Sequence, residues 1–132
     1  MFDFETQKMN VKAALITAGI LISPLVVAGD ISGFWKHTEE LAWIEIRLEE
    51  RTGVVLRTDK HPDRVGRILL KDLSADGSEP NVWRGKVYAV RLGEYKDAKI
   101  SLIGTDKLSI TVEIGFFSRT VDWLRVDEIP AE

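Results

Sequence analysis

The sequence predicts an all-β fold, a single antiparallel eight-stranded up-and-down barrel that follows an N-terminal signal helix. From Asp30 onward, apolar residues recur at every second position, which is the spacing of half-buried strands. Gly, Pro, Asp and Asn interrupt these stretches at short intervals. Strands joined by tight turns pair with their neighbours, and closure removes the exposed edges. A sandwich, the second choice, needs longer connections, for which only 74–81 is a candidate.

An apolar segment near the N-terminus predicts a secretory signal peptide. Lys12 precedes a charge-free run over 13–29, and Pro24 stands near its end, where a signal helix usually breaks. Small residues at 26–28 (VVA) fit the positions that a signal peptidase reads, so we expect cleavage after Ala28.

These features predict a signal peptide over 1–28 and a barrel domain over 29–132. The residues before Met9 are acidic and fit a signal peptide poorly, so Met9 is an alternative start. The expected location is periplasmic or secreted. The alternative is an uncleaved leader that anchors the domain to the inner membrane, although the run is short for a spanning helix.

Composition excludes several classes of function. The net charge is −3 with interspersed signs, which offers no general attraction to nucleic acid. Cysteine is absent, which excludes disulfides, thiol nucleophiles, thiolate metal sites and a lipid-anchor cysteine. A hydrophobic content of 45% is typical of a globular domain.

The strands are predicted from alternation and from the turns between them. Leu108, Ile110 and Val112 alternate with polar residues in the clearest strand. Turn residues separate the strands at 51–53 (RTG), 61–63 (HPD), 76–81, 104–106 (GTD) and Gly115. The predicted strands are 32–37, 41–49, 53–59, 64–73, 82–90, 96–103, 107–114 and 117–126.

The first strand contains Gly33-Phe34-Trp35, which resembles the Gly-x-Trp signature of lipocalins and related calycin barrels. The resemblance implies that Trp35 closes the base of the barrel and that an arginine of the last strand packs across it. Arg125 is the first candidate for that arginine, and Arg119 the second. A guanidinium on an indole face contributes about 0.5–2 kcal/mol.

A longer series of motifs resembles the exported bacterial family called domain of unknown function 2147. The matching segments are 65–69 (VGRIL), 83–88 (WRGKVY), 95–102 (YKDAKISL) and 117–126 (FSRTVDWLRV). The resemblance implies export and a lipocalin-like barrel, and it supplies no activity. Members usually carry Asp-Pro after the tyrosine of the fifth strand, whereas Ala89-Val90 follows Tyr88 here, which puts a shared ligand site in doubt.

Aromatic and arginine residues within the strands are the candidates for a ligand site. They either fill the core or line a cavity, since small barrels do both. Arginines on apolar strand faces either reach solvent along the outer surface or meet an anionic head group inside. The candidate ligand-binding residues are Trp43, Trp83, Tyr88, Arg119 and Trp123.

No catalytic or metal-binding constellation emerges from the sequence. His37 and His61 lack the spacing of metal ligands, and neither lies in a recognised serine context. We therefore expect no enzyme, no metal and no cofactor. The leading hypothesis is a carrier for a small apolar or amphipathic molecule. The alternative is an envelope interaction or structural module with a filled core, which contacts a partner through its surface.

Overall fold

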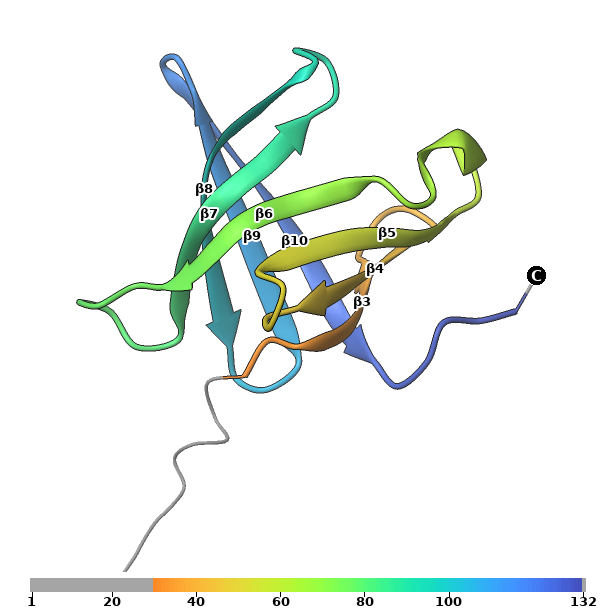
Figure 1. Cartoon of the computed structure of the whole chain (residues 1–132), viewed down its shortest axis with the longest axis horizontal. Helices are drawn as coiled ribbons and strands as arrows, with labels where there is room; N and C mark the ends of the chain where they lie inside the picture. The colour runs from red at the N-terminus through yellow and green to blue at the C-terminus, as the bar shows by residue number, and fades with distance from the viewer. Residues whose placement is uncertain (1–29, 132) are drawn as a thin grey trace, which may run out of the picture. The chain divides into compact units, whose positions relative to one another are not determined.

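Residues 30–131, which the computed structural model describes, form a closed antiparallel barrel of eight strands (Figure 1). Each strand pairs with its neighbour in sequence, and the last closes on the first. The predicted all-β antiparallel barrel is confirmed, whereas the predicted signal helix lies outside the described residues. The strands are β3 (Gly33–His37), β4 (Ala42–Arg47), β5 (Thr52–Thr58), β6 (Ile68–Ala75), β7 (Val82–Ala89), β8 (Glu94–Ile103), β9 (Lys107–Ile114) and β10 (Phe117–Val126).

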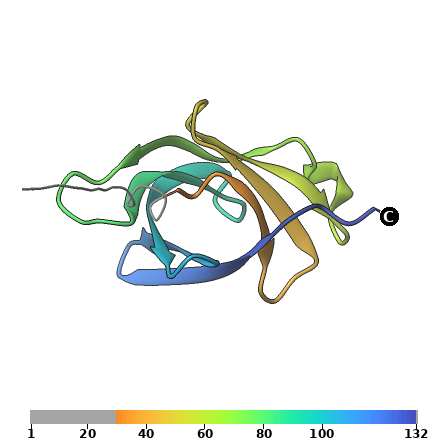
Figure 2. The same ribbon diagram turned by 90° about the horizontal axis from the view of Figure 1, so that it is seen from below.

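The β10–β3 pairing closes the ring of strands that Figure 2 shows from below. In its register Arg125 lies opposite Trp35, and Trp123 lies opposite His37. Closure involves the end of β10: residues 123–126 pair with β3, whereas residues 117–122 have no partner residue in that strand. Within the described residues, no helix is long and apolar enough to cross a membrane.

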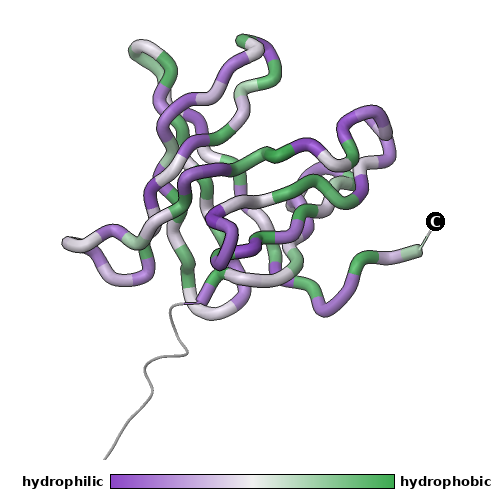
Figure 3. Tube along the Cα trace, viewed as in Figure 1, coloured by the Kyte–Doolittle hydropathy of each residue, from purple (hydrophilic) through white to green (hydrophobic). Residues whose placement is uncertain are grey.

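The core follows from the alternation of apolar and polar residues along the strands, visible as changing colour in Figure 3. On β4, Ile44 and Ile46 are 1% exposed, whereas Glu45 between them points to the outer face. Core residues from all strands gather in one cluster. Its most deeply buried members are Ile31, Trp35, Ile44, Ile46, Leu70, Leu73, Ile100 and Leu108.

The connection from β5 to β6 differs from the predicted strand over 64–73. A short 3-10 turn occupies Pro62–Arg64, and β6 begins only at Ile68. Proline at the start of the turn fixes a helical φ, and Gly66 has a φ of 92°, which other residues rarely adopt. These two residues delay the strand and bring Arg64 over one end of the barrel.

An irregularity in β6 explains a glycine in β7. The β6–β7 register shifts between Lys71 and Ser74, and Asp72 has a φ of 56° there. A Cβ on Gly85 would lie 2.8 Å from the carbonyl oxygen of Lys71 and 2.9 Å from Cδ2 of Leu73. The close approach of the two strands therefore requires glycine at this position.

The β6–β7 loop is held by Asp76. Its carboxylate accepts the backbone N–H of Ser78 at 2.8 Å and Nε of Arg84 at 3.0 Å. The hydrogen bond from Ser78 and then that from Arg84 hold the pKa of Asp76 well below its usual range. These two hydrogen bonds link the start of the loop to β7.

Candidate functional site

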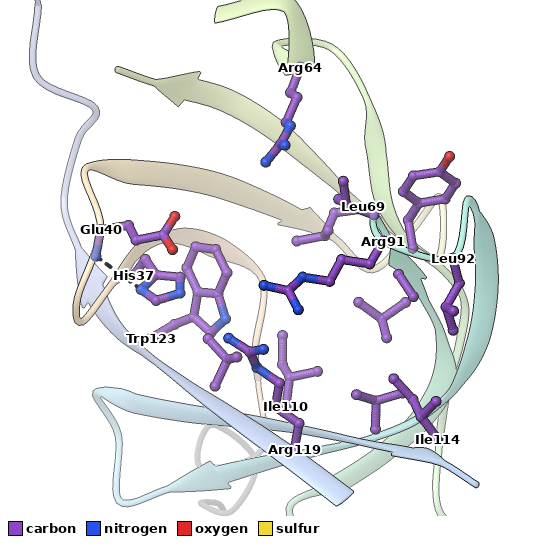
Figure 4. Close-up of a pocket in the computed structure, with 16 residues that line it drawn as sticks. His37, Glu40, Arg64, Leu69, Arg91, Leu92, Ile110, Ile114, Arg119 and Trp123 are labelled. Carbon is purple, nitrogen blue, oxygen red and sulfur yellow. Dashed lines mark hydrogen bonds between the residues drawn. The ribbon is translucent and has the colours of Figure 1, made fainter. Parts of the chain in front are cut away.

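A cavity of about 420 Å³ lies at the barrel end that carries the β3–β4, β5–β6, β7–β8 and β9–β10 connections (Figure 4). It is partly open to solvent. Its walls are mostly aliphatic side chains of β6, β7, β9 and β10 and of the β7–β8 turn: Leu69, Val87, Ala89, Val90, Leu92, Ile110, Val112, Ile114 and Val121. A smaller hollow of about 150 Å³ shares His37, Glu40 and Leu69 with it and extends toward β4 and β5.

Three arginines reach this cavity from different parts of the chain. Arg64 comes from the 3-10 turn, Arg91 from the β7–β8 turn and Arg119 from β10 (Figure 4). Within residues 30–131, none of the three guanidinium groups has a hydrogen bond, an ion pair or a ring contact. Glu40 supplies the one carboxylate among the lining residues of this cavity. The mouth therefore combines apolar walls with an excess of positive charge.

Trp123 forms one wall of the cavity beside His37. The two rings meet edge to face with centroids 5.0 Å apart, and His37 Nδ1 accepts the backbone N–H groups of Glu39 and Glu40 at 3.0 and 3.1 Å. These bonds fix the imidazole against the indole. Trp123 is 5% exposed, and its Nε1–H has no hydrogen-bond partner among the described residues. A buried indole donor normally has one.

The opposite end of the barrel is closed by Trp35 and Arg125. The Arg125 guanidinium lies 4.4 Å from the centroid of the fully buried Trp35 ring, whose Nε1 donates to Ile31 O at 3.0 Å. Arg125 also donates to Ser32 O at 3.0 Å and Thr105 O at 2.9 Å. Gly33 has a φ of 125°, with its missing Cβ 3.4 Å from Arg125 Nη1. The structure thus brings together Gly33, Trp35 and Arg125, the residues predicted to close the barrel.

The structure separates the five candidate ligand residues. Arg119 and Trp123 line the cavity, and Tyr88 borders it, with its ring between Tyr95 and the Arg67 guanidinium. Trp83 packs in the core cluster and is absent from the lining of the cavity.

Trp43 lies outside the core cluster, on the outer face of the barrel. It pairs with Lys36 and Arg57, and both cations lie over its ring, at 5.6 and 4.9 Å from the centroid. Its neighbour Ile44 takes the inward position. Trp43 and Trp83 therefore do not line the cavity.

Sequence reasoning missed Arg64, Arg91 and most of the aliphatic lining. Arg91 stands between Tyr88 and Tyr95, in a loop whose flanking aromatic residues are evident from the sequence. Among residues 30–131, no three His, Asp or Glu side chains come close enough together to hold a metal ion. The chain matches no family model, no curated protein and no solved structure. The resemblances to lipocalins and to domain of unknown function 2147 therefore rest on the quoted motifs.

Proposed function

We propose that this protein is an exported carrier whose barrel holds one small apolar or amphipathic molecule. The observation that carries the proposal is the aliphatic cavity of about 420 Å³ at one end of the barrel. Sites for small molecules typically measure about 300–1,000 Å³ and are mostly apolar, with a few polar groups. Protein interiors are otherwise close-packed, so a hollow of this size forgoes many contacts that a ligand would restore.

The division of the barrel into two ends supports the proposal. Trp35 and Arg125 close one end, and Ile110 and Trp123 of the core cluster line the cavity at the other. On the motifs quoted above, we also propose that the barrel is lipocalin-like and that the chain belongs to the family called domain of unknown function 2147. Export to the periplasm or medium is inferred from the predicted leader, and neither catalysis nor nucleic-acid binding is part of the proposed role.

Binding of N-phenylnaphthylamine, an uncharged fluorophore that brightens in apolar surroundings, tests the carrier. Val112→Trp places a large side chain in the cavity, because Val112 lines it. Val54→Trp is the matched control, since Val54 pairs with Glu45 on the outer face. We expect the wild-type protein and the control to bind the probe and Val112→Trp to lose binding, with circular dichroism showing that all three are folded. A folded wild-type protein that does not bind the probe would refute the carrier.

A second candidate function is an envelope module that contacts a protein partner. Phe116 is fully exposed and Phe117 is 79% exposed at the β9–β10 turn, which is unusual for adjacent aromatic residues. A photo-crosslinking amino acid in place of Phe116, compared with the same substitution at Gly77 in the β6–β7 loop, tests this function in cells. One defined adduct formed from position 116 and not from position 77 supports the envelope module. If no such adduct forms, this second function is contradicted.

A further inference from the structure

We infer that the ligand of this cavity is an anionic amphiphile, whose carboxylate or phosphate head group is bound by Arg91, Arg119 and Arg64 and whose apolar tail lies against the aliphatic walls. This inference rests on the proposed function, because it assumes that the cavity holds a ligand. It adds the charge of the ligand and its orientation in the barrel.

The three cavity arginines differ from every other arginine that the structure describes. Arg47, Arg57 and Arg84 form ion pairs with carboxylates at 2.8–3.0 Å. The remaining arginines bind backbone carbonyls or lie over aromatic rings: Arg51, Arg67 and Arg125. In a chain with a net charge of −3, acidic partners are abundant. Unpaired arginines gathered at one cavity therefore indicate a binding role for an external anion.

The arrangement of these side chains suits one oxyanion. In Figure 4 the guanidinium groups of Arg91 and Arg119 extend into the same space beside Trp123, and Arg64 extends toward it from the other wall. Like charges that share one space repel each other, and an anion between them reverses the sign of the interaction. Guanidinium groups also match the planar geometry of carboxylate and phosphate oxygens.

Trp123 provides a second, independent indication of a polar ligand atom. Its Nε1–H is unpartnered although the residue is 95% buried, and the ring lines the cavity. A buried donor without a partner costs about 1–3 kcal/mol. An oxygen of the bound head group would satisfy it, whereas a pure hydrocarbon would leave it unpaired.

The positions of polar and apolar groups set the orientation of the ligand. Arg91 and Arg119 are exposed, whereas Trp123 and Ile110 are each 5% exposed. The head group therefore lies between the arginines at the mouth and the Trp123 indole, and the tail lies against the aliphatic walls. A cationic head group would instead meet three arginines against the single carboxylate of Glu40.

Ligands that share a chain of ten carbons and differ in head group test the inference. Displacement of N-phenylnaphthylamine is measured for decanoate, decyl phosphate, decanol and decyltrimethylammonium. The wild-type protein is compared with a triple variant, Arg64→Gln, Arg91→Gln and Arg119→Gln, and with the control Arg47→Gln on the outer face. We expect at least one anion to bind about tenfold or more tightly than decanol, since charge-assisted hydrogen bonds add this much. The triple variant should lose that advantage and keep the affinity for decanol.

The possible outcomes distinguish failure of the head-group assignment from failure of the carrier function. A preference for decanoate over decyl phosphate assigns a carboxylate head group, the reverse assigns a phosphate, and both support the inference. Equal binding of decanol and the anions, or an anion preference that survives in the triple variant, overturns the inference while the carrier function stands. Tightest binding of decyltrimethylammonium also overturns it. If the folded wild-type protein binds neither the probe nor any of the four ten-carbon ligands, both proposals fail.

Discussion

Replacement of Arg125 by methionine tests whether the contacts at the closed end of the barrel stabilise the fold. The guanidinium donates to Ser32 O at 3.0 Å and to Thr105 O at 2.9 Å, and it lies 4.4 Å from the centroid of Trp35. The two carbonyls come from the segment before β3 and from the β8–β9 turn, so one side chain links the strand ends at the point of closure. Methionine keeps an apolar contact with the indole and removes both hydrogen bonds.

The expected loss of stability follows from these contacts. Hydrogen bonds from a charged donor contribute about 1.5–3 kcal/mol each, and the cation–indole contact about 0.5–2 kcal/mol. The Arg125 side chain is 28% exposed, and water can replace part of what is lost, which favours the lower values. We therefore expect Arg125→Met to lower the free energy of unfolding by about 2–4 kcal/mol. For a domain of this size, this corresponds to a fall in Tm of about 10–20 °C.

Urea unfolding followed by tryptophan fluorescence measures this loss. Arg125→Lys should fall between the wild type and Arg125→Met, because one ammonium group cannot reproduce the planar fork that reaches both carbonyls. Arg47→Met is the control: it removes a partly exposed ion pair with Glu45, for which we expect a loss below about 1 kcal/mol. An Arg125→Met variant no less stable than this control would show that the contacts of Arg125 do not stabilise the barrel, and a lysine variant equal to the wild type would contradict the role of the guanidinium fork.

Two further predictions concern the strands. Gly85→Ala, whose Cβ would lie 2.8 Å from a backbone oxygen, should lower the free energy of unfolding by about 1–3 kcal/mol in a denaturant titration, whereas Gly77→Ala, with open space around its Cβ, should change it little. Asp122 accepts a hydrogen bond from Ser109 Oγ at 2.7 Å, and this bond, together with the charge of Lys107, lowers its pKa in the folded protein. Its stabilisation is therefore present above the unfolded pKa of 3.8 and is lost as pH falls through the lower folded value. The stability difference between the wild type and Asp122→Asn should accordingly shrink on acidification below about pH 4, and a difference that grows there would contradict the assignment.

The order and type of the strands could be predicted because their signals are local. The strand predicted over 107–114 matches β9, and the one over 117–126 matches β10, since alternation and turn residues act within a few positions. The β5–β6 connection was missed because 64–69 reads as an alternating strand, whereas Pro62 and Gly66 impose a helical turn and then a reversal. The closure residues could be named only through a motif resemblance.

The candidate site was predicted less completely than the fold. Trp123 and Arg119 share a strand face with Val121, so their common position could be read from the period of β10. Which face of β10 points inward depends on how this strand pairs with β3 and β9, and the pairing cannot be read from the residues of β10 alone. Trp43 shows the consequence: it lies on the outer face, covered by Lys36 and Arg57.

The fold class, the approximate strand positions and the absence of cysteine chemistry follow from the sequence alone, because backbone propensity and side-chain alternation are properties of short segments. The hollow at one end of the barrel became evident from the packing of the strands, since a cavity is the volume that side chains from many strands leave unfilled. The same packing brings Arg64, Arg91 and Arg119, which are far apart in sequence, to one mouth. The antiparallel order of the strands puts alternate turns at the same end, and closure of the barrel arranges them around one opening.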